Sequence, residues 1–63
     1  MIELTNGKET ILVNPNNIST IVSHGKGSKL HMNDGSVTYV DNDVMDVMQK
    51  IVNSRFGIEG GVQ

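Results

Sequence analysis

The chain has 63 residues, no cysteine and a formal net charge of −2 at pH 7. This length supports one domain with a thin core, because a chain of this size buries only about 60% of its unfolded surface. The composition excludes a disulfide scaffold and a membrane span of about 20 apolar residues, and it disfavours a protein that wraps nucleic acid. We therefore expect a small cytoplasmic protein that gains stability as a homodimer or higher oligomer.

The start of the chain has the pattern of a β-hairpin. Ile2 and Leu4 are spaced by two, and the dipeptide Asn6-Gly7 tolerates the positive φ of a tight turn. We expect a second strand over residues 10–14, ending at Pro15, which presets φ for a corner.

Three further strands are expected between the proline corner and residue 40. Residues 18–23 break strict alternation, which indicates either a β-bulge or a strand covered on both faces. The two glycines of HGKGS at residues 24–28 suit a hairpin before the strand over residues 29–32. Asn33-Asp34-Gly35 then suits a type I′ or related turn leading into residues 36–40.

After residue 40 the spacing of apolar residues changes from two to about 3.6, which indicates an amphipathic helix. Its apolar positions are Val44, Val47, Met48, Ile51 and Val52. Residues 41–43 offer a choice of N-cap, and Gly57 is expected to end the helix. We expect the glycine-rich tail, residues 57–63, to be frayed or ordered only by a partner subunit.

These elements predict a mostly β fold of the α+β type. Its five strands form an antiparallel meander or small open barrel, followed by one C-terminal amphipathic helix. Residues 1–56 make the single domain. Apolar side chains of the helix region are expected to form the oligomer interface, namely Met45, Met48, Val52 and Phe56.

Residues for catalysis or metal binding are not grouped by any spacing in the sequence. The two histidines, His24 and His31, have no carboxylate at a spacing that would complete a metal site. The acidic residues at positions 41–46 are explained by the positive end of a helix dipole. We therefore expect a protein that is not an enzyme and that uses no metal and no cofactor.

Positive charge gathers in the hairpin HGKGSK at residues 24–29. The sequence differs from a phosphate-binding P-loop because Gly27 follows Lys26, and a strand rather than a helix comes next. Backbone amides of a glycine-rich loop beside cationic side chains can still receive an anion such as a nucleotide phosphate. The residues expected to contact a ligand or partner are His24, Gly25, Lys26, Gly27, Lys29 and His31.

A series of motifs runs in a recognisable order along residues 1 to 55. It consists of Met1-Ile2, Leu4-Thr5, Asn6-Gly7-Lys8-Glu9, Asn14-Pro15, Asp34-Gly35 and the helix positions Val44, Val47 and Ile51. In this order the chain resembles the FlbD/SwrD family of small flagellar and swarming-motility proteins. The resemblance implies a non-enzymatic protein that is encoded among flagellar genes and linked to motor power. We therefore expect a motility accessory protein that acts by protein contact.

Two other functions stay open. One is a small oligomeric inhibitor or ligand-sequestering protein of the kind that phages and mobile elements encode. It would bind a nucleotide-type anion near Lys26 and Lys29 at a subunit interface. The other follows from the opening M-x-x-LT strand, which is similar to that of the carbon storage regulator family of RNA-binding dimers. RNA contacts in that family depend on arginines where this chain has Asn6-Gly7 and Val40-Asp41, so RNA binding is less favoured.

Overall fold

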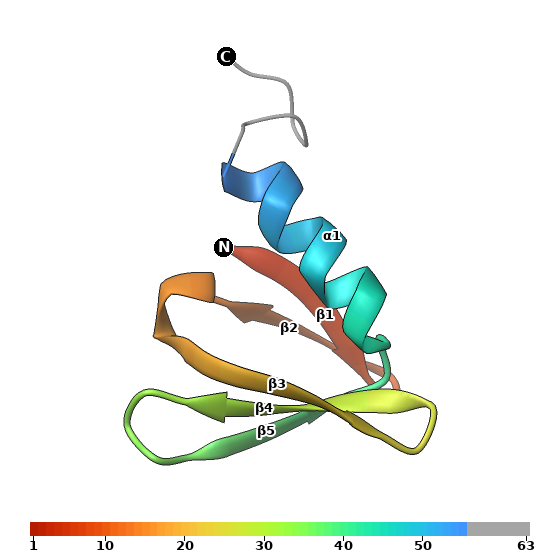
Figure 1. Ribbon diagram of the computed structural model, residues 1–63. Coiled ribbons are helices and arrows are strands. Elements are labelled where there is room, and N and C mark those ends of the chain that lie inside the picture. Colours follow the sequence, from red (N-terminus) through yellow and green to blue (C-terminus); the bar gives the residue numbers. More distant parts are fainter. Residues whose placement is uncertain (56–63) are drawn as a thin grey trace.

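The fold is that of a computed structural model, which describes residues 1–55 (Figure 1). Its elements are β1 (Ile2–Asn6), β2 (Glu9–Val13), the 3-10 helix η1 (Pro15–Asn17), β3 (Ile18–His24), β4 (Gly27–Met32), β5 (Val37–Val40) and α1 (Val44–Arg55). The predicted fold class, five antiparallel strands and one C-terminal helix, is confirmed. The predictions for Phe56, for Gly57 and for the tail lie outside the described residues.

The meander divides at η1 into two antiparallel sheets. One contains β1 and β2, the other has the order β3-β4-β5, and over residues 1–55 the strands do not close into a barrel. Helix α1 lies above the sheets, next to β1 (Figure 1). The chain therefore forms an open, layered structure in which a small hairpin and a helix cover one face of the larger sheet.

The first two hairpins share one loop geometry. Gly7-Lys8 joins β1 to β2, and Gly25-Lys26 joins β3 to β4. Gly7 has a φ of 63° and Gly25 a φ of 59°, while no non-glycine residue among positions 1–55 has a positive φ. A positive φ at the first loop residue alone is the pattern of a type II′ turn, which matches the twist of the flanking strands.

Strand β3 contains a β-bulge. Its pairing with β4 shifts register between Ile18 and Thr20. The Ser19 hydroxyl donates a hydrogen bond of 2.9 Å to the carbonyl of His31 and so fastens the bulge to β4. Of the two explanations for the broken alternation in this strand, the bulge is confirmed.

The turn between β4 and β5 is not of type I′. Gly35 has a φ of 92°, but Asp34 does not have the positive φ that a type I′ turn would require. The Gly35 N–H donates to the Met32 carbonyl at 3.0 Å, and the Met32 N–H donates to the Ser36 carbonyl at 2.9 Å. The loop is therefore a three-residue connection in which a type I turn is followed by a left-handed glycine.

The core lies between the sheets and one side of α1. Its buried members are Ile2, Leu4, Val13, Leu30, Val40 and Val47. Val47 and Ile51 face this core, as the helical period predicts. Met48 and Val52 stay 47% and 41% exposed, because the apolar stripe of α1 is wider than the surface available to cover it.

The backbone of Thr5 is the point where the first hairpin meets the rest of the chain. In this type of hairpin Thr5 belongs to a non-hydrogen-bonded pair, so its N–H and C=O point away from β2. The Thr5 N–H donates to the Asn42 side-chain oxygen at 2.9 Å, and the Asp41 N–H donates to the Thr5 carbonyl at 2.8 Å. Residues 41 and 42 thus supply the partners that a neighbouring strand would supply.

Asp41 and Asn42 also bond to the first hairpin loop, to β4 and to α1. We call these two residues the Asp41-Asn42 junction. The Gly7 N–H donates to Asp41 Oδ2 at 2.7 Å, which fixes the first hairpin loop. The Ser28 hydroxyl donates to the Asn42 carbonyl at 2.7 Å, and Asn42 Nδ2 donates to Asp46 Oδ2 at 2.7 Å. The junction therefore connects the β1-β2 hairpin, β4 and α1.

Asp43 is the residue that caps α1. The Asp46 N–H donates to Asp43 Oδ1 at 2.8 Å, and the Val47 N–H donates to the Asp43 carbonyl at 3.0 Å. This is the geometry of an N-cap, in which a side-chain oxygen satisfies an unpaired amide of the first turn. Asp43 thus fills the capping role, which leaves the other two residues of the stretch for the junction.

Asn42→Ala tests the junction. It removes the acceptor for Thr5 and the donor to Asp46, and it should lower the free energy of unfolding by about 1–2 kcal/mol. The matched control is Asn53→Ala, because the Asn53 side chain bonds to Gln49 on the helix surface, and its change should stay within about 0.5 kcal/mol. Urea denaturation measures both, and an equal loss in the two variants would contradict the role of the junction.

A second prediction concerns Asp34. Hydrogen bonds from the Ser36 hydroxyl and from the Ser36 backbone N–H hold the pKa of Asp34 below its ordinary value of 3.8. A lowered pKa in the folded state stabilises the fold above the ordinary pKa, and this contribution is lost as the pH falls through the folded pKa.

Ser36→Ala removes the hydroxyl and should raise the pKa of Asp34 toward its ordinary value. A carboxyl-carbon NMR titration of the folded protein reads this pKa directly. The titration of Asp34 in the wild-type protein under identical conditions is the reference. An unchanged Asp34 titration would show that the hydroxyl does not contribute.

Candidate functional site

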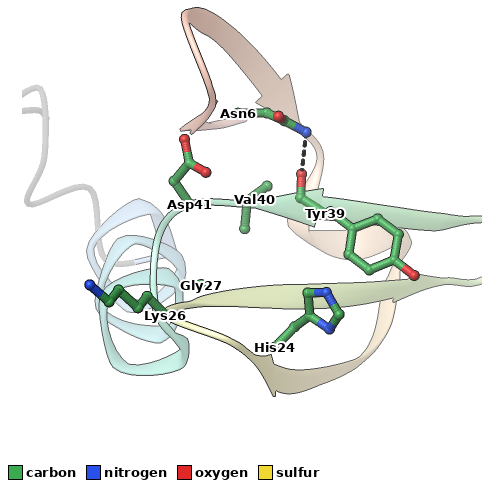
Figure 2. A pocket seen from close by; sticks show the side chains of 7 residues that line it. All are labelled: Asn6, His24, Lys26, Gly27, Tyr39, Val40 and Asp41. Atoms are coloured by element: carbon green, nitrogen blue, oxygen red, sulfur yellow. Dashed lines mark hydrogen bonds between the residues drawn. The ribbon is translucent and has the colours of Figure 1, made fainter.

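A pocket of about 480 Å³ opens where the first hairpin meets one end of the larger sheet (Figure 2). We call it the Gly27 pocket, and it is lined by Asn6, His24, Lys26, Gly27, Tyr39, Val40 and Asp41. Its volume falls in the range of roughly 300–1,000 Å³ that is common for binding sites in proteins. The lining residues come from β1, β3, β4, β5 and two connecting segments, so the folded chain is needed to form it.

Gly27 brings the strands at the pocket close together. A Cβ atom at this position would collide with the carbonyl oxygen of Val40. The backbone of β4 can therefore approach the end of β5 only because this residue has no side chain. The glycine is a geometric requirement of the site, whether or not its amide contacts a ligand.

The rings of His24 and Tyr39 lie together at one end of the pocket (Figure 2). Their centroids are 4.8 Å apart and their planes are inclined by 53°. This tilted arrangement lies within the range of favourable aromatic contacts. Since Tyr39 is 47% exposed, the pair offers an aromatic surface to solvent.

Charged groups lie at the other end of the pocket. Figure 2 shows Lys26 and Asp41 on the side away from the two rings. The Asp41 carboxylate is positioned by the Gly7 N–H, and Asn6 Nδ2 donates to the Tyr39 carbonyl at 2.8 Å. Because a lysine and a carboxylate both line it, the pocket does not have the uniformly positive surface of a strong phosphate site.

The pocket continues into the side of the β3-β4-β5 sheet that faces away from the core. The register places Val22, Lys29 and Tyr39 in one row across the sheet, and Thr20, His31 and Val37 in the next. We call this surface the outer face, and its residues are Thr20, Val22, His24, Gly27, Lys29, His31, Val37 and Tyr39. It contains apolar, aromatic and basic side chains and no acidic one.

The six residues predicted to contact a ligand are divided between these surfaces. His24, Lys26 and Gly27 line the pocket. Lys29 and His31 lie on the outer face, and Gly25 occupies the loop position with positive φ. Contact with a ligand or partner stays a prediction for all six.

Sequence reasoning missed four residues of the pocket, namely Asn6, Tyr39, Val40 and Asp41. Asn6 lies more than 30 positions from the other three, and its side-chain bond to the Tyr39 carbonyl has no periodic signature. One signal was available: Tyr39 is the only tyrosine and sits opposite Lys29 once the Asn33-Asp34-Gly35 turn sets the register.

The predicted oligomer interface is in part accessible. Met45 is 72% exposed on α1, as are Met48 and Val52 to a smaller extent, while Phe56 lies outside the described residues. A partner subunit on this surface stays a prediction.

No protein-family model, curated protein or solved structure matches this chain. Over residues 1–55, no three side chains of the His, Asp or Glu type come together as ligands for a metal ion. Helix α1, with 12 residues, is too short to cross a membrane. Because none of the comparisons found a match, the resemblance to the FlbD/SwrD family stays a prediction.

Gly27→Ala should destabilise the protein by about 1–3 kcal/mol or more, because the added methyl group forces β4 away from Val40. Gly25→Ala is the comparison, since a Cβ there meets no atom within 4 Å and only the positive φ is strained, at about 1–2 kcal/mol. Thermal unfolding followed by circular dichroism ranks the two. A Gly27→Ala protein as stable as wild type would show that the close approach is absent in solution.

Proposed function

We propose that this chain is a non-catalytic binding module that acts by contact with a protein partner through its outer face and the Gly27 pocket. One observation carries the proposal. Val22, Val37 and Tyr39 are 36%, 41% and 47% exposed on one side of a sheet whose other side forms the core. A concentrated set of exposed apolar and aromatic side chains is typical of an interaction surface.

The chemistry of the outer face favours a particular kind of partner. Lys29 lies between Val22 and Tyr39, and His24 and His31 flank this row. No carboxylate lies on the outer face, so an acidic surface with apolar side chains at its centre would complement it. Tyrosine beside a pocket is a common anchor in such contacts, because it buries a large area with little loss of side-chain entropy.

The resemblance to the FlbD/SwrD family supports a protein of flagellar motility as this partner. In this proposal the module acts in the cytoplasm and contributes to motor power by binding, without transforming a substrate. The pocket would then accept a side chain of the partner between the aromatic and the charged ends.

A second candidate is the sequestration of a nucleotide-type anion. It is favoured by the grouping of His24, Lys26 and Gly27 in one pocket, and it is disfavoured by the carboxylate of Asp41 in the same place. An NMR titration with adenosine monophosphate separates the candidates. Shifts of the Gly27 and Tyr39 amides that are absent in Lys26→Gln would support this second function over protein contact.

Site-specific photocrosslinking in cells that naturally encode this chain tests protein contact. A benzophenone amino acid at Tyr39 should capture one protein, whereas the same group at Leu12, an exposed apolar position at 65% on β2, should not. The captured protein, once purified, should bind Tyr39→Ala about tenfold or more weakly than wild type in calorimetry. Equal capture at both positions, or unchanged affinity of Tyr39→Ala, would contradict the proposal.

A further inference from the structure

Strand β3 forms an open edge of the larger sheet. Over residues 1–55 it pairs with β4 alone. The opposite edge, β5, is held by the first hairpin, since Asn6 Nδ2 donates to the Tyr39 carbonyl and the Asp41 N–H donates to Thr5. The chain thus covers one edge of the sheet with its own atoms and leaves the other to pair with another strand.

The geometry of the hairpin shows which backbone groups face this open edge. His24 and Gly27 flank a two-residue loop, so they form a hydrogen-bonded pair. Along an antiparallel ladder, hydrogen-bonded and non-hydrogen-bonded pairs alternate. Ile21 and Ser23 then belong to non-hydrogen-bonded pairs with β4. Their N–H and C=O groups point away from β4, toward the open edge.

Beyond its bulge, β3 has none of the features that protect an edge strand. Proteins usually protect such a strand with lysine, proline, an inward charge, a β-bulge or a short length. β3 has seven residues, ISTIVSH, with no proline and no Lys, Arg, Asp or Glu. The bulge before Thr20 disturbs one end, and residues 20–24 remain in regular pairing with β4.

We propose that a second copy of this chain pairs with this edge, β3 against β3 in antiparallel orientation and centred on Ile21. This register places Ile21 opposite the partner's Ile21 and Thr20 opposite the partner's Val22, so β-branched side chains meet and no like charges do. The arrangement is self-complementary and closes with twofold symmetry.

The pairing would stabilise a chain with a thin core, and it would enlarge the outer face. Over residues 1–55 the core has six buried hydrophobic side chains, and small domains with thin cores are commonly stabilised by association. The two outer faces would become one continuous surface carrying Val22, Val37 and Tyr39 from each copy. The proposed dimer rests on the β3 edge alone and does not require the protein partner of the proposed function.

Analytical ultracentrifugation of the purified full chain over micromolar to millimolar concentrations tests the proposal. The wild-type chain should form a dimer. Val22→Lys should raise the dissociation constant about tenfold or more, because lysine on an edge strand opposes pairing. Val37→Lys is the matched control: it is the same substitution on the same face at similar exposure, but on β5, and it should leave the dimer intact.

Ser23→Pro provides a second test that acts on the backbone. The proline removes an N–H that points to the open edge and leaves the ladder with β4 intact, so the dimer should be lost while the circular dichroism spectrum is retained. A wild-type monomer at millimolar concentration would overturn the proposal. A dimer that survives Val22→Lys but is lost in Met48→Asp would also overturn it, in favour of the exposed side of α1.

Discussion

The fold depends on the hydrogen bonds that the backbone N–H and C=O of Thr5 make outside the first hairpin. Its N–H and C=O point out of the first hairpin, and the Asp41-Asn42 junction bonds both of them. The same junction fixes the Gly7 loop, receives the Ser28 hydroxyl and reaches Asp46 in α1. A two-stranded hairpin and a short helix, each marginally stable alone, are thereby joined to the larger sheet around one core. The position of the Gly27 pocket follows, because Asp41 and Tyr39 are held next to Asn6 by this connection.

A thin core also determines which surfaces are left for binding. Leu30 and Val40 contribute to the core from one side of the β3-β4-β5 sheet, and α1 and the first hairpin cover that side. The outer face has no such cover within residues 1–55, so its apolar and basic side chains face solvent. The proposed protein contact uses this face, and the proposed dimer uses the β3 edge beside it. The two uses are compatible, because pairing at the edge extends the face without covering it.

Local patterns in the sequence predicted most of the fold. Alternation and glycine positions gave the strands and loops, the irregular spacing in β3 corresponded to a true bulge, and the change of period located α1. Asn33-Asp34-Gly35 does join two strands, as expected of a type I′ or related turn. The sequence left the turn type open because Asn-Asp-Gly also fits a three-residue loop, and the choice depends on which residues pair across it. The contact between the junction and the first hairpin could not be predicted, since its side-chain bonds to Thr5 and Gly7 join residues 37 and 34 positions apart. For the same reason sequence reasoning found three residues of the pocket and missed the four that β1, β5 and the junction contribute.

Native-state hydrogen exchange, followed by NMR at increasing urea concentration, tests most directly whether the junction makes one cooperative unit of the chain. The amide of Leu4 reports on the first hairpin and that of Leu30 on the larger sheet. If the junction couples the two, both amides will exchange with the same opening free energy, equal to that of global unfolding. If Leu4 opens at a clearly lower free energy than Leu30, the hairpin is an independent unit and the central claim is contradicted.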